Sequence, residues 1–150
     1  MLTDGRLYYG ARGEPLQCFN TKDGHGLMSL ARAGVAIAIL SGRRSAAVTR
    51  RSRELGIRHV VQGSRDKIRD FRTLAAKLGV TAAQCAFVGD DSPDVPLLRE
   101  VGLAFAVADA HPGARAAAHH VTRLGGGRGA VREVCDRLLA AHCAAHGPGH

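Results

Sequence analysis

The 150-residue sequence has no tryptophan, two tyrosines and four phenylalanines. Proteins that bind single-stranded nucleic acid stack bases on aromatic side chains placed among basic residues, so this shortage argues against such a role despite a net charge of +8. Lysine is scarce as well. Of the 21 basic residues, only Lys22, Lys67 and Lys77 are lysine, and the others are arginine. Arginine suits phosphate recognition, but the joint excess of alanine, glycine and arginine favours codon bias as the explanation. We expect no nucleic-acid partner.

Long apolar runs and paired cysteines are also missing. The longest strongly apolar run, Val35 to Leu40, is far too short to cross a bilayer, and the short polar start does not resemble a signal peptide. Its four cysteines form no Cys-x-x-Cys pair, and none stands at zinc-finger spacing from a histidine. We expect a soluble cytoplasmic protein with reduced thiols and no membrane partner.

Apolar strand patterns alternate with helical patterns along the chain. We expect strands at 35–40, 59–61, 85–88, 103–107 and 120–121, and helices at 23–34, 44–55, 66–78, 93–101, 112–118 and 131–145. The first strand lacks polar alternation, which is typical of burial on both faces of a parallel sheet. Residues 6–19 predict a β-hairpin, and 125–150 form a C-terminal tail. The chain is predicted to be one α/β domain over residues 1–150 with a doubly wound parallel sheet.

Two basic or hydroxyl-bearing motifs open helices after predicted strands. Ser41-Gly42-Arg43 follows the first strand, where a hydroxyl and free backbone N–H groups can hold a phosphate oxygen. Taken alone, this motif favours an ordinary serine cap. Lys67 stands in the first turn of its helix, beside the positive end of the helix dipole, so a negative group should offset it. A bound phosphate, Asp66 or solvent can do so.

Three carboxylates follow the strand at 85–88, in Gly89-Asp90-Asp91-Ser92-Pro93-Asp94. They repel one another unless a cation shares them, and hard oxygen ligands at a strand end suit Mg²⁺. The alternative is an acidic turn with a helix cap before Pro93. Ligands bind beyond the carboxyl ends of strands in open α/β sheets. Together, the three motifs predict a phosphate and magnesium site.

The order and spacing of these motifs resemble the capless haloacid dehalogenase phosphatases that act on 3-deoxy-D-manno-octulosonate 8-phosphate. The resemblance covers nearly the whole chain, through Leu2-Thr3-Asp4-Gly5, Phe19 to Gly24, Ser41-Gly42-Arg43, Gly63-Ser64 with Lys67, Val88 to Asp91, Val107 to Pro112 and Gly126 to Val134. The last two segments are specific to this subfamily. The resemblance implies a haloacid dehalogenase-like, Rossmann-like fold with the hairpin as a flap.

The resemblance also implies residue roles in a phosphomonoesterase for that sugar-acid phosphate or a related one. Ser41 and Lys67 would contact the phosphoryl group, and Asp90 would ligate Mg²⁺ with support from Asp91 and Asp94. The implied substrate contacts are Asn20, Thr21, Lys22, Asp23, Gly24, Arg43, Arg51, Lys67 and Arg128. The Arg128 segment would reach a neighbouring active site in a homotetramer that the hairpin helps to form.

The sequence departs from the family pattern at its start. The family opens with a hydrophobic strand and Asp-x-Asp-Gly-Val-Leu-Thr-Asp-Gly, and Leu2-Thr3-Asp4-Gly5 matches only the end of that motif. In the family, the first aspartate forms an aspartyl-phosphate and the second acts as acid and base. Neither is present here, and Asp4 is expected to lie past the site. The missing central strand would leave the strands at 35–40 and 85–88 with unpaired edges.

We therefore expect the chain as given to be inactive and to fold poorly or associate. We also expect the upstream DNA, read in frame from a GUG start at the motif's valine, to encode an apolar strand ending in Asp-x-Asp-Gly. The alternative is a non-catalytic module that binds sugar phosphate or supports assembly.

Overall fold

The computed structural model describes residues 1–11, 13 and 15–146. The strands are β1 Tyr8–Tyr9, β2 Pro15–Leu16, β3 Ala38–Ser41, β4 His59–Gln62, β5 Ala86–Gly89, β6 Leu103–Ala106 and β7 His120–Val121. The helices are α1 Thr21–Arg32, α2 Ala46–Glu54, α3 Lys67–Leu78, α4 Val95–Glu100, α5 Pro112–Ala117 and α6 Ala130–His146. Every predicted element occurs, with its ends within about three residues, as expected for boundaries read from sequence. The 3₁₀ turns η1 Ala82–Gln84 and η2 Ser92–Asp94 were not predicted.

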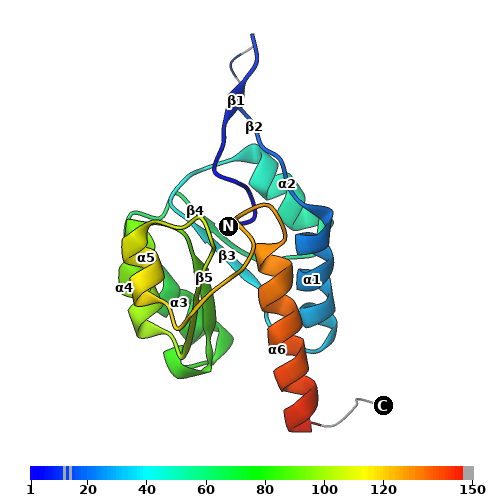
Figure 1. The fold of residues 1–150 in the computed structure, drawn as a ribbon, viewed down its shortest axis with the longest axis vertical. Helices are drawn as coiled ribbons and strands as arrows, with labels where there is room; N and C mark the ends of the chain where they lie inside the picture. Colours follow the sequence, from blue (N-terminus) through cyan, green and yellow to red (C-terminus); the bar gives the residue numbers. More distant parts are fainter. Residues whose placement is uncertain (12, 14, 147–150) are drawn as a thin grey trace.

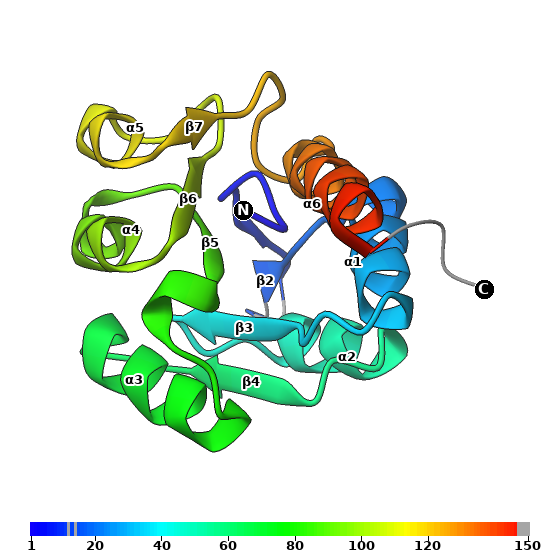
Figure 2. The ribbon, with the colours of Figure 1, turned by 90° about the horizontal axis from the view of Figure 1, so that it is seen from below.

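The parallel strands form two separate sheets. One pairs β3 with β4, and the other has the order β5-β6-β7. The antiparallel hairpin β1–β2 stands away from the rest of the molecule (Figure 1). Figure 2 shows the N-terminal segment between the two parallel sheets. The predicted parallel α/β class is confirmed, and within the described residues β3 and β5 each have one strand partner, as the predicted unpaired edges require.

Helices lie on both sides of these sheets. Helices α3, α4 and α5 form one layer, while α1 and α6 pack side by side in another (Figure 1). The larger core cluster surrounds α4 and β6 and includes Leu97, Leu98 and Ala104, all fully buried. The smaller cluster joins α1 to α6 through Leu30, Val131 and Cys135. Met1 packs against both clusters, so the N-terminal segment helps to join the layers.

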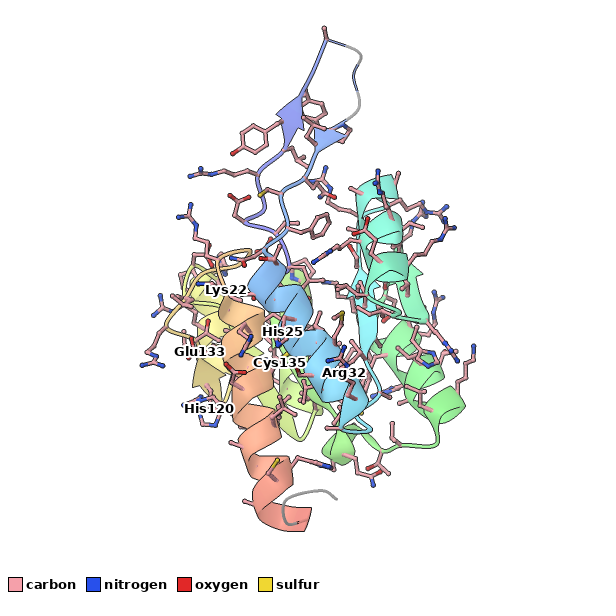
Figure 3. The ribbon with its side chains drawn as sticks, turned by 90° about the vertical axis from the view of Figure 1, so that its right-hand side faces the viewer. Lys22, His25, Arg32, His120, Glu133 and Cys135 are labelled. Carbon is pink, nitrogen blue, oxygen red and sulfur yellow. The ribbon has the colours of Figure 1, made fainter. Side chains whose placement is uncertain are left out.

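Glycine permits the close approach of α1 to α6. Gly26 is buried on α1, and a Cβ atom at this position would lie 2.9 Å from the Cβ of Cys135. Atoms do not pack at that separation without displacement, because protein interiors are already close-packed. Figure 3 shows the two helices side by side, with Lys22 and His25 on α1 and Cys135 on α6.

The prediction that the strand at 35–40 is buried on both faces is wrong. Ala36 and Ala38 are exposed, and Ala86 of β5 is exposed as well. By contrast, Ala104, Phe105 and Ala106 of β6 are almost fully buried. The difference follows from position, since β6 has a strand on each side and packs against α4 and α5, whereas β3 and β5 are edge strands.

Side-chain caps fix where α1, α2 and α3 begin. Asn20 accepts a hydrogen bond from the Lys22 N–H at 2.9 Å, and Ser45 and Asp66 cap α2 and α3 in the same way. These bonds satisfy N–H groups that have no partner inside the helix. The caps place the predicted site motifs at defined helix starts. Among the described residues, no helix combines the length and apolarity that a membrane span requires.

Candidate functional site

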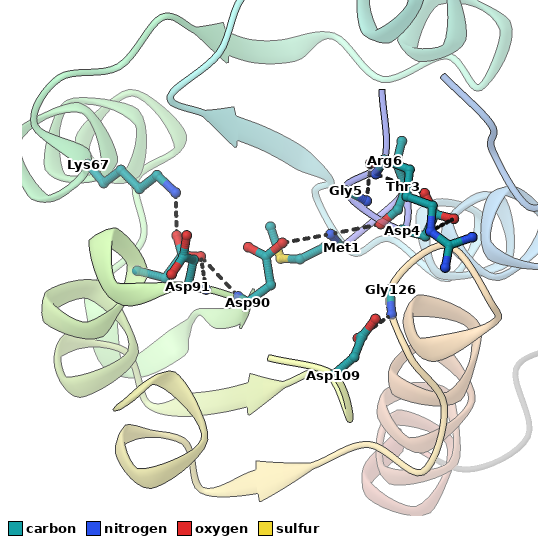
Figure 4. Close-up of polar contacts among 11 residues, drawn as sticks. Met1, Thr3, Asp4, Gly5, Arg6, Lys67, Asp90, Asp91, Asp109 and Gly126 are labelled. Atoms are coloured by element: carbon teal, nitrogen blue, oxygen red, sulfur yellow. Dashed lines mark hydrogen bonds and ion pairs between the residues drawn. The ribbon is translucent and has the colours of Figure 1, made fainter. Parts of the chain in front are cut away.

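Asp94 is the centre of the polar cluster that follows β5. It is completely buried, and its Oδ2 accepts hydrogen bonds from the Asp90 N–H at 3.0 Å and the Asp91 N–H at 3.2 Å. Its Oδ1 accepts from the ammonium of Lys67 (Figure 4). A Cβ atom at Gly89 would lie 2.9 Å from the Cβ of Asp94, so glycine at the end of β5 makes room for this carboxylate.

Asp94 also explains how Lys67 tolerates the first turn of α3. Burial by itself raises the pKa of Asp94, but the Asp90 N–H and the Lys67 ammonium outweigh it and hold the pKa below its ordinary value. The carboxylate is therefore charged at neutral pH and offsets the lysine. Asp66, which the sequence left open as the offsetting group, instead caps α3 through the Arg69 N–H at 3.0 Å.

Asp90 faces a cavity of about 250 Å³ beyond the ends of β5 and β6. The cavity is lined by Thr3, Asp4, Asp90, Asp91, Val107, Asp109, His111 and Gly126. Burial raises the pKa of Asp90, although the Met1 ammonium, 3.3 Å from its Oδ2, acts in the opposite direction (Figure 4). The structure thus places the Asp90 carboxylate on the cavity wall.

The other predicted acids contribute differently. Asp91 accepts from the Ser92 N–H at 2.7 Å and caps η2, while both oxygens of Asp94 are engaged inside the protein. No group of three or more metal-binding side chains occurs among residues 1–11, 13 and 15–146. Asp90 and Asp91 line the cavity, and Asp91 is already engaged as the cap of η2.

The expectation from the sequence that Asp4 lies past the site is wrong. Asp4 lines the same cavity as Asp90. The segment of residues 1–4 folds back against the glycines at 125–127, and the Gly127 N–H donates to the Met1 carbonyl at 2.8 Å. This contact spans almost the whole chain, which is why local sequence patterns did not reveal it. The Asp4 carboxylate accepts from the Arg6 N–H at 3.0 Å.

A second cavity of about 520 Å³ collects four predicted substrate residues. It is lined by Thr21, Lys22, Gly24, His25, Met28, Arg51, Glu54, Leu55 and Arg132. Arg51 lies close over Gly24, where a Cβ atom would meet its guanidinium at 2.5 Å, and its Nη1 donates to Glu54 at 3.1 Å. The cavity therefore joins cationic groups to an apolar surface from Met28 and Leu55.

Asn20 and Asp23 have structural partners. Asn20 caps α1, and Asp23 is 1% exposed between α1 and α6. Asp23 Oδ1 accepts from the Arg132 N–H at 2.9 Å, at the start of α6. Burial raises the pKa of Asp23, and the bonds from α6 oppose that rise only in part. Asp23 is therefore closed to a ligand in this structure because its carboxylate is used between two helices.

Ser41, Arg43 and Arg128 line neither cavity. Ser41 is half-buried after β3, and its Oγ accepts from the Arg43 N–H at 3.2 Å. Arg43 and Arg128 are exposed. The predicted set is thus divided between the Asp90 cavity with the adjacent Lys67–Asp94 pair, the Arg51 cavity and the loop after β3.

Sequence reasoning gave no role to several residues of the Asp90 cavity. Val107, Asp109 and His111 follow β6, the strand beside β5, and so reach the same edge of the sheet. They belong to a segment that marked the subfamily. The rule that ligands bind beyond the carboxyl ends of parallel strands is the signal that would have found them.

Known proteins are similar to this chain over nearly all of its length. Residues 47–129 match the family model of haloacid dehalogenase-like hydrolases. The 3-deoxy-D-manno-octulosonate 8-phosphate phosphatase of Yersinia pestis is 46% identical over 141 residues, which are 94% of this chain and 75% of that protein. The chain belongs to this haloacid dehalogenase-like phosphatase family.

Solved structures of this phosphatase family share the fold. The crystal structure of the Yersinia pestis phosphatase superposes with a TM-score of 0.93 at 45% identity and covers 98% of this chain and 80% of that one. The Moraxella catarrhalis phosphatase gives 0.92 at 42% identity, with 94% and 81% covered, and that structure holds a magnesium ion, a phosphate ion and a KDO molecule. The predicted haloacid dehalogenase-like fold is confirmed.

Proposed function

We propose that this chain forms the metal- and substrate-binding parts of a Mg²⁺-dependent phosphomonoesterase acting on 3-deoxy-D-manno-octulosonate 8-phosphate or a related sugar-acid phosphate. The observation that carries the proposal is the arrangement at the end of β5, in which buried Asp94 binds both the Lys67 ammonium and the Asp90 N–H. It fixes a lysine next to the segment whose Asp90 carboxylate lines the cavity, which suits a phosphate bound through a cation. Similarity to phosphatases of this specificity supports the substrate class.

The residues present fit magnesium. Mg²⁺ uses one or two carboxylates, and its remaining ligands are water and substrate phosphate oxygens. Asp90 supplies one such carboxylate on the wall of the cavity. Asp94 would orient Lys67 and the backbone of Asp90 and Asp91 without touching the metal. When bound, Mg²⁺ would withdraw charge from the phosphoryl oxygens.

The sugar-acid part of the substrate suits the Arg51 cavity. A carboxylate there would meet Lys22 and Arg51, while Met28 and Leu55 would contact carbon atoms. Arg51 makes paired bonds to carboxylates more readily than lysine does. We propose that Thr21, Lys22, Gly24 and Arg51 form this binding surface, whereas Ser41, Arg43 and Arg128 remain predicted contacts.

A specific observation favours the second candidate, a non-catalytic sugar-phosphate-binding module. The carboxylates of Asp4 and Asp109 line the Asp90 cavity, but they accept hydrogen bonds from the N–H groups of Arg6 and Gly126. Each contact orients one carboxylate oxygen, and neither residue belongs to an Asp-x-Asp pair that could supply both a nucleophile and an acid/base. We propose that this chain alone binds substrate without turnover, and that catalysis needs an Asp-x-Asp segment encoded upstream.

Phosphate release distinguishes the two candidates. The assay uses 3-deoxy-D-manno-octulosonate 8-phosphate and Mg²⁺, with this chain and with a chain extended by its in-frame upstream residues. If the protein is an enzyme, the extended chain should release phosphate, and Asp90→Asn should abolish this turnover. Glu100→Gln, which changes an exposed ion pair with Arg72, should preserve it. Binding without turnover in both chains would support the module. Turnover retained in Asp90→Asn would refute the metal assignment.

A further inference from the structure

The middle one of three consecutive glycines, Gly125 to Gly127, lines the Asp90 cavity. The Arg128 N–H donates to the Gly125 carbonyl at 3.1 Å, and Gly127 has a φ of 67°, so residues 125–128 form a tight turn. Gly126 is buried and lines the cavity. Glycine loses more conformational freedom on ordering than any other residue. A turn with three of them needs specific contacts to keep one shape.

Backbone contacts hold part of this turn. The Gly127 N–H donates to the Met1 carbonyl at 2.8 Å. A Cβ atom on Gly126 would lie 2.9 Å from the Thr3 carbonyl oxygen, and one on Gly127 would lie 2.6 Å from the Asp4 nitrogen. Glycines therefore allow the turn to lie directly against residues 1–4. These contacts hold Gly126 beside Thr3 and Asp4, which line the same cavity.

Asp109 adds a side-chain contact to the turn. Its Oδ1 accepts from the Gly126 N–H at 2.8 Å (Figure 4), and a Cβ atom on Gly125 would lie 2.9 Å from its Oδ2. Among the described side chains, this carboxylate is the one that binds a backbone N–H of residues 125–128. Asp109 follows β6, so it connects the glycine turn to the best-buried strand of the molecule.

We propose that Asp109 is a positioning residue that fixes the glycine turn, and with it the cavity wall and the start of the Arg128 segment. Its importance for ligand binding rests on the proposed function, but its effect on the turn does not. The competing role is a direct one, in which the Asp109 charge acts on a bound cation or substrate. The oxygen acceptor and the charge can be separated by substitution.

Hydrogen exchange of peptides spanning residues 122–130 tests the effect on the turn. Asp109→Ala removes the acceptor and should speed exchange by up to about tenfold, the effect expected for the loss of one hydrogen bond. Asp109→Asn keeps an oxygen for the Gly126 N–H and should stay near the unchanged protein. Glu100→Ala, which removes a carboxylate elsewhere, is the control. Unchanged exchange in Asp109→Ala would overturn the proposal.

Gly125→Ala is an independent variant in case Asp109→Ala does not fold. Its Cβ would press against Asp109, so it should also speed exchange of the turn while leaving the carboxylate in place.

Titration of inorganic phosphate with Mg²⁺ then separates positioning from charge. Positioning predicts weaker binding in Asp109→Ala and Gly125→Ala but not in Asp109→Asn. Equal loss of binding in Asp109→Asn and Asp109→Ala would show that the charge acts directly and would overturn positioning. Absence of phosphate binding in every protein would count against the proposed function alone, because exchange still decides the role of Asp109 in the turn.

Discussion

At the scale of single residues, two buried aspartates have opposite electrostatic surroundings. Asp94 gains a lysine and two N–H donors, which together lower its pKa despite burial. Among the described residues, Asp23 forms no ion pair and its Oδ2 lacks a hydrogen-bond partner; burial raises its pKa, and the N-terminal ammonium opposes that rise only in part. The first carboxylate is stabilised in its charged form, while the second is destabilised in it.

Removal of Lys67 should therefore destabilise the protein. Lys67→Met leaves the buried charge of Asp94 without its cation, and breaking a buried pair costs about 3 kcal/mol of unfolding free energy. Lys77→Met, an exposed lysine on the same helix, is the matched control and should cost about 0.5 kcal/mol. Urea unfolding measures both. Equal losses in the two variants would contradict the ion-pair argument, and adding Asp94→Asn to Lys67→Met should recover part of the loss.

Asp23→Asn should change how stability depends on pH. The folded state raises the pKa of Asp23 above its ordinary value of 3.8, so this group favours folding below pH 3.8 and that contribution is lost as pH rises through the folded pKa. Asparagine does not titrate. The unfolding free energy of Asp23→Asn, relative to the unchanged protein, should increase between pH 3 and pH 7.

Urea unfolding at several pH values measures this difference. Asp136→Asn, at an exposed position on α6, reports the effect of removing one surface charge. A difference for Asp23→Asn that stays constant or falls as pH rises would show that burial does not destabilise the Asp23 charge.

Residues with local roles were predictable, whereas those with distant partners were not. The Lys67 position on a helix start signalled that a negative group must offset it, because the helix dipole acts locally. The bond from Arg132 to Asp23 joins residues 109 positions apart, and no local pattern encodes it. The same limit hid Asp4, which reaches the Asp90 cavity through contacts with the glycine turn.

At the scale of elements, helices were easier to predict than strand surroundings. Gly79 ends α3 with a φ of 67°, the left-handed conformation that glycine adopts without strain, and the sequence indicated this end directly. The exposure of Ala36 and Ala38 depends on which other strands and helices lie beside β3. Apolar character alone therefore suggested more burial than the fold provides.

The hairpin exposes three large side chains that have no core to fill. Tyr8, Tyr9 and Leu16 are 52%, 67% and 68% exposed, and an isolated two-stranded hairpin is marginally stable in water. We propose that this element associates with other copies, in a homotetramer. Replacing all three residues with serine should lower the molar mass measured by light scattering while leaving the helical circular dichroism unchanged.

Leu124→Ser is the matched control for that experiment, because Leu124 is 47% exposed but lies outside the hairpin. It should leave the mass unchanged. If the triple serine variant keeps the mass of the unchanged protein, the hairpin is not the associating element.

At the scale of the whole molecule, the separation of the two parallel sheets should govern local stability. Strand β6 has hydrogen-bonded neighbours on both sides, whereas β3 and β5 have one each within the described residues. Opening an edge strand breaks one row of hydrogen bonds, and opening β6 breaks two. Local opening free energies should follow that order, because amide exchange reports regional as well as global unfolding.

Residue-resolved amide exchange should therefore be slowest at Phe105 and its neighbours in β6 and faster in β3 and β5. Burial acts in the same direction, since Phe105 is 2% exposed while Ala38 and Ala86 are exposed. The two effects separate at Leu40, which is 9% exposed but lies in an edge strand. Fast exchange at Leu40 would show that strand pairing dominates, whereas exchange there as slow as at Phe105 would show that burial dominates and would contradict the order expected from strand pairing.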